Sequence, residues 1–167
     1  NCSMKELLEK LTTYNIFNYL FPGILFIGMM EYLGGYDTSH NSVIFLLFFA
    51  YFYGLIISRI GSIIVEPLLK KCRFVKYADY GDYLKASKKD PAINTLLEVN
   101  NMYRTLIALL LSMTAVLLSN YCKIQCEWLA EHKHILVIFF LLILFLYSFK
   151  KQTSYIVKRV ERSKQDE

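Results

Sequence analysis

The sequence predicts an all-α, polytopic membrane protein with four transmembrane helices and both termini in the cytoplasm. Of its 167 residues, 55% are hydrophobic and 16% are aromatic, which is more apolar than an ordinary soluble domain. These residues are gathered into blocks long enough to cross a hydrocarbon core of about 30 Å. Lysine and arginine are concentrated after the second block and in the C-terminal tail, and the positive-inside rule places both sections in the cytoplasm.

Residues 1–15 predict a short amphipathic helix that lies at the cytoplasmic interface. Ser3 and Glu6 have the spacing of a capping box at a helix start. The apolar residues that follow fall on one helical face, opposite the charged residues. The mixed charge of the first turns and the lack of a small-residue cleavage site argue against a secretory signal. A simple extension of the first span is the alternative.

The first predicted span covers residues 16–33 and is interrupted within its first third. Asn15 and Asn18 stand at its entrance, and Pro22 is followed by Gly23. Proline removes a hydrogen bond of the helical ladder, so a kink is expected there. The carbonyl that proline leaves free needs a partner inside the membrane. An asparagine amide from this helix or a neighbouring one is the candidate.

The second predicted span, residues 43–66, is the element around which we expect the other spans to pack. Small side chains recur at every fourth position along one face, and such seams let helix backbones approach closely in membranes. Glu66 and Pro67 are expected to end this helix at the water boundary. The helix-packing seam consists of Ala50, Gly54, Ser58, Gly61 and Ser62.

Arg59 lies inside the second apolar run, where a charged group is costly and commonly functional. One interpretation is that Arg59 snorkels to cytoplasmic water. Helical side chains lean towards the helix N-terminus, however, and here that end points deeper into the membrane. We therefore expect Arg59 to pair with a carboxylate, either Glu98 or Glu66 of a neighbouring subunit.

The second half of the chain contains one long polar section and two further apolar blocks. Asp90 and Pro91 predict a helix start, and the helical pattern runs from Ala92 without a break into the third span. The predicted segments are a cytoplasmic section of residues 67–105, a third span of 106–121, a fourth span of 135–149 and a basic tail of 150–167.

Eight basic residues of the cytoplasmic section predict a surface for anionic lipid headgroups or for a cytosolic protein. The tyrosines and the phenylalanine interleaved with them also fit nucleic acid, since such stretches pair with phosphates and stack on bases. Lysine and tyrosine just inside a span are typical of headgroup contacts, so membrane lipid is expected and direct nucleic-acid binding is not. The eight residues are Lys70, Lys71, Arg73, Lys76, Lys85, Lys88, Lys89 and Arg104.

The sequence carries no pattern typical of catalysis, of a metal site or of a cofactor. It has no Gly-rich phosphate loop and no nucleophile motif. His132 and His134 are two residues apart, which places them on different helix faces. We expect no enzymatic activity, no metal and no cofactor.

Three strings carry a resemblance to known proteins: YNIFNYLFPG (14–23), YGLIISRIGSIIVEP (53–67) and NNMYRT (100–105). They resemble small four-span membrane proteins of bacterial anti-phage defence loci, the membrane subunits of Kiwa systems among them. The resemblance implies a homo-oligomer of the bacterial inner membrane, with a tetramer as the first expectation. It also implies a protein that senses membrane disturbance during infection and works with a cytosolic, DNA-binding partner.

A pore-forming effector that depolarises the membrane on a cytosolic signal is the alternative function. A conducting pore needs a polar or gated path, whereas the fourth span offers only lipid-like side chains. The polar lining would have to come from the second or third span. The candidates are Ser58, Ser62, Ser112 and Thr114.

Overall fold

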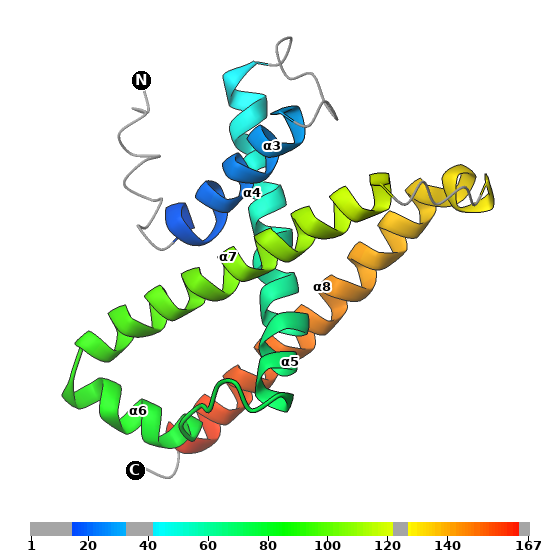
Figure 1. Cartoon of the computed structure of the whole chain (residues 1–167). Helices are drawn as coiled ribbons and strands as arrows, with labels where there is room; N and C mark the ends of the chain where they lie inside the picture. Colours follow the sequence, from blue (N-terminus) through cyan, green and yellow to red (C-terminus); the bar gives the residue numbers. More distant parts are fainter. Residues whose placement is uncertain (1–14, 33–41, 122–126, 164–167) are drawn as a thin grey trace.

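The computed structural model describes residues 15–32, 42–121 and 127–163, and every secondary-structure element in them is a helix. The predicted all-α class is therefore confirmed for the described chain. The predicted interfacial helix of residues 1–15 lies almost wholly outside the described residues. The helical elements are η1 (Ile16–Leu20), α3 (Phe21–Tyr32), α4 (Val43–Ile60), η2 (Gly61–Val65), α5 (Glu66–Lys71), α6 (Tyr80–Lys89), α7 (Ala92–Tyr121) and α8 (Glu127–Ser163) (Figure 1).

Three helices are long and apolar enough to cross a membrane. They are Val43–Lys71, Ala92–Leu118 and Ile135–Lys158. The first apolar helix, Ile16–Tyr32, is shorter, and at 1.5 Å per residue it is about 25 Å long. Three of the four predicted spans thus correspond to helices long and apolar enough to cross a membrane, whereas the first, residues 16–33, corresponds to the shorter apolar helix Ile16–Tyr32.

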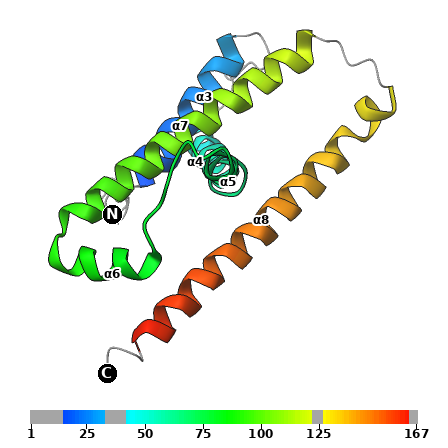
Figure 2. The same ribbon diagram turned by 60° about the horizontal axis from the view of Figure 1, so that its bottom comes forward.

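The continuous rod formed by α4, η2 and α5 is the centre of the fold. The η1–α3 helix packs along α4, and α7 crosses the rod at α4 and η2. Viewed nearly along the rod, α3 and α7 lie on one side of it and α8 lies on the other (Figure 2). A small apolar core fills the crossing with α7 and consists of Ile57, Val65, Ala108, Leu109 and Met113.

The predicted seam of small residues is used inside the chain. A Cβ added to Gly23 would overlap the Ala50 carbonyl oxygen, and a Cβ added to Gly54 would overlap the Tyr19 carbonyl oxygen. The first helix and α4 therefore lie backbone against backbone. Further along the seam, a Cβ at Gly61 would lie 3.2 Å from the carbonyl oxygen of Arg104 on α7.

Both prolines that interrupt apolar helices follow a five-residue π-turn. η1 ends two residues before Pro22, and η2 ends two residues before Pro67. In η1 the N–H of Phe21 donates to the carbonyl five residues earlier, and in η2 the N–H of Glu66 does the same. A π-turn widens the helix, which makes room for a proline ring that would otherwise meet the carbonyl four residues back.

This arrangement corrects the expected end of the second helix. Glu66 and Pro67 do not end the second helix. The π-turn leaves room for the proline ring, so the chain stays helical to Lys71. The predicted interruption near Pro22 has the same physical form. The unbroken helix from Ala92 into the third apolar block is confirmed, since α7 runs for 30 residues.

The last helix, α8, extends past both ends of the fourth predicted span. It starts at Glu127 and remains helical to Ser163, because no glycine or proline interrupts this stretch. Among the α8 side chains that the structure describes, only Leu144 and Ser148 are buried. α8 is therefore attached to the central rod along a narrow line, and the rest of its apolar surface is open.

Candidate functional site

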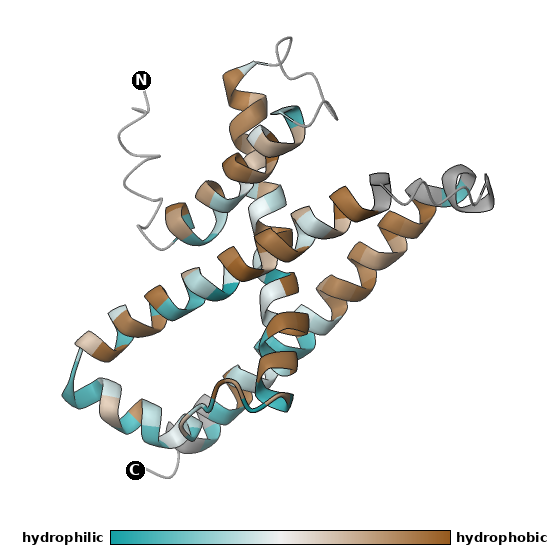
Figure 3. Cartoon of the chain, viewed as in Figure 1, coloured by the Kyte–Doolittle hydropathy of each residue, from teal (hydrophilic) through white to brown (hydrophobic). Residues whose placement is uncertain are grey.

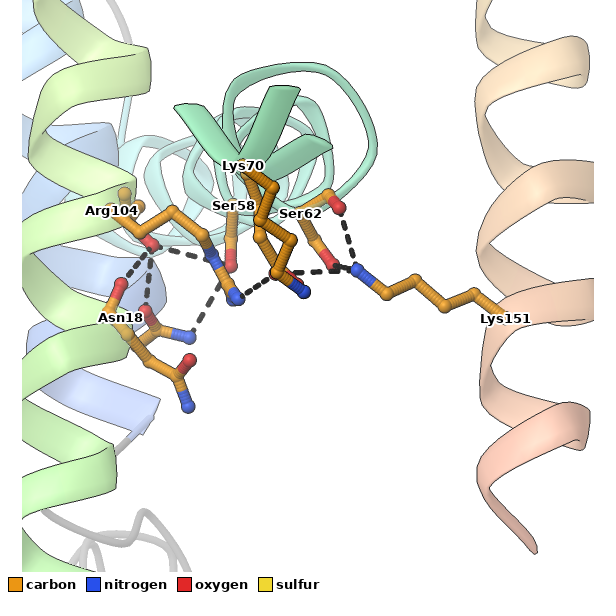
Figure 4. A network of polar contacts seen from close by, with 9 residues as sticks. Asn18, Ser58, Ser62, Lys70, Arg104 and Lys151 are labelled. Carbon is orange, nitrogen blue, oxygen red and sulfur yellow. Dashed lines mark hydrogen bonds and ion pairs between the residues drawn. The ribbon is translucent and has the colours of Figure 1, made fainter. Parts of the chain in front are cut away.

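A buried carboxylate, Glu66, gathers cations from three helices. Its side chain is 6% exposed at the start of α5. Oε1 accepts a hydrogen bond from Lys70 Nζ at 2.7 Å. Oε2 accepts one from Arg104 Nη1 at 2.7 Å and one from Lys151 Nζ at 3.3 Å. Arg104 belongs to α7 and Lys151 to α8 (Figure 4), so a single charged group joins α5, α7 and α8.

Lys151 reaches from α8 to the central rod with an extended side chain (Figure 4). Its Nζ also donates to the Ser62 carbonyl oxygen at 2.7 Å and to Ser62 Oγ at 2.9 Å. A lysine ammonium has three N–H donors, so Ser62 and Glu66 together satisfy all of them. These two residues are four apart and share one helix face. We refer to Ser62, Glu66, Lys70, Arg104 and Lys151 as the Glu66 network.

A neutral polar cluster lies beside this network, deeper among the helices. Asn18, Ser58 and Thr105 are almost fully buried and belong to η1, α4 and α7. Asn18 Nδ2 donates to Ser58 Oγ at 3.3 Å. Thr105 Oγ1 lies 2.8 Å from Asn18 Oδ1 and 2.9 Å from the Asn101 carbonyl oxygen, and its single proton serves one of them at a time.

This cluster gives Asn18 a role that differs from the one expected. Its side chain joins the first helix to α4 and α7, where a polar group must find partners inside the chain. The sequence pattern instead predicts that an asparagine amide bonds the carbonyl that Pro22 leaves free. Asn15, the other predicted asparagine, precedes η1, and its side chain does not cap that helix.

Within one chain, Arg59 contacts a tyrosine hydroxyl instead of the expected carboxylate. Its Nη2 donates to the Tyr19 hydroxyl at 3.2 Å, across the close contact between η1 and α4. Glu98 is exposed on α7 and forms no ion pair with any described residue. Glu66 is already surrounded by Lys70, Arg104 and Lys151. A pair between Arg59 and Glu66 of a neighbouring subunit stays a prediction.

The eight predicted basic residues divide into two groups. Lys70 and Arg104 belong to the Glu66 network, and Lys70 Nζ also lies 4.0 Å from the centre of the Tyr77 ring. The other six are exposed on the end of α5, on the connection to α6 and on α6 itself. They are Lys71, Arg73, Lys76, Lys85, Lys88 and Lys89.

Sequence reasoning missed Lys151 as a site residue. It marked only the end of the fourth apolar block, in a run of two lysines. The sequence patterns place Ser62 in the helix-packing seam and Glu66 at the expected helix end, and neither pattern joins the two residues into one site. The four-residue spacing of Ser62 and Glu66 is the signal that indicates a binding place for a cation from another helix. This spacing does not identify which lysine or arginine binds there.

The described chain has the features of one class, helical multi-pass membrane proteins: three of its helices are long and apolar enough to cross a membrane, and internal ion pairs join them. Within the described residues, no three metal-ligating side chains come together. No protein-family model, no curated protein and no solved structure matches the chain.

Proposed function

We propose that this chain is a non-enzymatic membrane subunit of a bacterial anti-phage defence system, located in the inner membrane. It acts as a homo-oligomer that senses membrane disturbance and signals to a cytosolic protein. The three strings within residues 14–105 support the defence context by resemblance. One geometric observation supports the sensing role, namely the attachment of α8 to the Glu66 network through Lys151.

The position of the network explains why it suits this role. α8 presents an almost wholly open apolar surface, which in a bilayer faces lipid or neighbouring subunits. The cytoplasmic section begins on α5 and ends on α7, and both of these helices hold Glu66 through a cation. A movement of α8 would therefore act through Glu66 on both α5 and α7, the helices on which the basic section begins and ends. That section, with its exposed lysines, is the proposed surface for the cytosolic partner.

The proposed topology has four spans with both termini in the cytoplasm. Figure 3 shows hydrophilic residues gathered in α6 and in the adjoining ends of α7 and α8, which supports one polar side. The helix Ile16–Tyr32 packs backbone to backbone along α4, so it shares the membrane depth of α4. A helix of about 25 Å can cross a bilayer that thins slightly around it.

We expect reporter fusions to show this topology. Alkaline phosphatase, which is active only in the periplasm, should be inactive at either terminus and within residues 76–90. It should be active when inserted after Tyr32, in the connection that contains no lysine or arginine. Periplasmic activity at the C-terminus, with the N-terminus in the cytoplasm, would contradict four spans, because an odd number of crossings would then separate the ends.

The geometry supports a sensor better than it supports a pore. Ser58 and Ser62 were candidates for a polar lining, but both are hydrogen-bonded inside the chain. The Thr114 hydroxyl donates to the Leu110 carbonyl of its own helix at 2.8 Å. We therefore expect the purified oligomer to conduct no ions in planar bilayers. Steady single-channel currents would favour the pore-forming effector instead.

The sensing role predicts a specific loss of phage protection for Lys151→Gln. Glutamine cannot supply three N–H donors and a charge, so α8 loses its tie to Glu66 and Ser62. Expressed with its neighbouring genes, this variant should lose at least tenfold in plaque protection at normal protein level. Lys150→Gln is the matched control, since Lys150 is exposed beside it. Equal protection by both variants would contradict the proposal.

A further inference from the structure

The Glu66 network contains more positive than negative charge. Lys70, Arg104 and Lys151 all contact one carboxylate, and no other carboxylate in the described residues pairs with any of them. Two positive charges of the network are therefore left without a counter-charge. In a low-dielectric setting such an excess attracts an anion.

Two of the three cations still have hydrogen-bond donors to offer. Lys151 uses all three of its N–H groups on Ser62 and Glu66. Lys70 uses one, and its side chain is 43% exposed. Arg104 uses one of its five N–H donors on Glu66; its buried Nε has no acceptor in the described chain, and the side chain as a whole is 16% exposed. Donors and uncompensated charge thus coincide at Lys70 and Arg104.

The surroundings of the network indicate which anion fits. Lys70, Arg104 and Lys151 lie on the three helices that are long and apolar enough to cross a membrane, Val43–Lys71, Ala92–Leu118 and Ile135–Lys158. Most of the apolar side chains of α8 are exposed along this length. A ligand at this place meets cationic donors at one end and apolar surface at the other. A phospholipid has this combination, with its phosphate beside its acyl chains, whereas a free anion has only the charged part.

We propose that Lys70 and Arg104 bind the phosphate of an anionic phospholipid headgroup at the edge of the Glu66 network. The Lys70 ammonium and the unused Nη donors of Arg104 hydrogen-bond the phosphate oxygens, and the excess charge favours phosphatidylglycerol or cardiolipin over zwitterionic lipid. The site rests on the membrane placement proposed above. It does not depend on the defence role.

The test uses the purified full-length chain in mild detergent, titrated with phosphatidylglycerol and followed by native mass spectrometry. We expect one saturable lipid per chain, with phosphatidylcholine binding at least tenfold more weakly. Lys70→Gln should weaken phosphatidylglycerol binding by about tenfold, the loss of one charge-assisted contact. Lys150→Gln removes the same charge on an exposed position and should change binding less than twofold. Equal losses in both variants would overturn the site, because they show a diffuse attraction.

A second variant separates a ligand site from a purely structural ion network. In Glu66→Gln the competing carboxylate is gone, so phosphatidylglycerol should bind several-fold more tightly and should raise the melting temperature of this variant more than that of the parent. A network with no ligand predicts no such gain, and its absence in a folded Glu66→Gln protein would refute the proposal. If this variant does not fold, the comparison of Lys70→Gln with Lys150→Gln decides.

Two further arms identify the source of the phosphate and separate this proposal from the function. Inorganic phosphate, at concentrations up to millimolar, should neither displace the lipid nor stabilise the protein. Displacement would overturn the lipid assignment in favour of a free anion. Phage protection without lipid binding would contradict the site alone. Lipid binding without protection would leave the site intact and contradict the defence role.

Discussion

Replacing Gly54 with alanine should destabilise the packing of the first helix on α4 by about 3 kcal/mol or more. The added methyl group would occupy the space of the Tyr19 carbonyl oxygen, which is backbone and cannot rotate away. Overpacking a core typically costs about 1 to 3 kcal/mol when side chains can adjust. Here the two helices have to separate, which also disturbs the Arg59–Tyr19 contact nearby. Leucine at position 54 should prevent accumulation of folded protein.

Gly28 provides the control for this prediction. It lies on the same apolar helix as Gly23, but an added Cβ there meets nothing within 4 Å. Gly28→Ala should therefore be neutral or slightly stabilising, since alanine is the better helix former by about 1 kcal/mol. Unfolding in detergent, followed by circular dichroism and by gel filtration, measures the stability of both variants. Equal stability of Gly54→Ala and Gly28→Ala would show that the close backbone contact does not exist.

Replacing Glu66 with leucine should have the second large effect, a loss of about 3 kcal/mol in detergent free of anionic lipid. Removing one partner of a buried ion pair costs about 3 to 5 kcal/mol, because the other charges remain without compensation. The lower end applies, since the side chains of Lys70, Arg104 and Lys151 are 43%, 16% and 29% exposed. α8 should also become more accessible to protease, because Lys151 loses one of its two anchors.

Glu98→Leu is the matched control for Glu66→Leu. It removes a carboxylate from an exposed position of α7 that forms no ion pair with the described residues, so the change should stay within about 0.5 kcal/mol. A double-mutant cycle with Arg104→Leu tests the cause. The double variant should be less destabilised than the sum of the single ones, since no charge is then stranded between those positions. Strict additivity would contradict the ion pair.

The features that could be predicted from the sequence are those set by local patterns. Hydropathy identified the apolar helices, Asp90 and Pro91 marked the start of α7, and the spacing of small residues identified the face of α4 that packs closely. Each of these signals lies within one helix. The seam predicts only that some backbone will come close, and its partner in this chain is the neighbouring helix around Tyr19 and Gly23.

The contacts of the candidate site depend on how the helices cross, which periodicity does not specify. Glu66 meets Arg104 and Lys151, which are 38 and 85 residues away in the chain. The lean of helical side chains suggested a carboxylate for Arg59, but the antiparallel pairing brings the Tyr19 hydroxyl within reach first. The helix also continues through Pro67 because a π-turn precedes the proline. No established local sequence pattern predicts a π-turn.

The length of α8 has a mechanical consequence. Its anchored residue, Lys151, divides a helix of 37 residues unequally. At 1.5 Å per residue, about 36 Å of rod lies between Glu127 and this anchor, and about 18 Å lies between the anchor and Ser163. A helix that tilts about a fixed point behaves as a lever, so a lateral shift at Glu127 would move Ser163 half as far in the opposite direction. The polar anchor at Lys151 would then serve as a fulcrum, and the short arm would carry the motion to the side of the basic section.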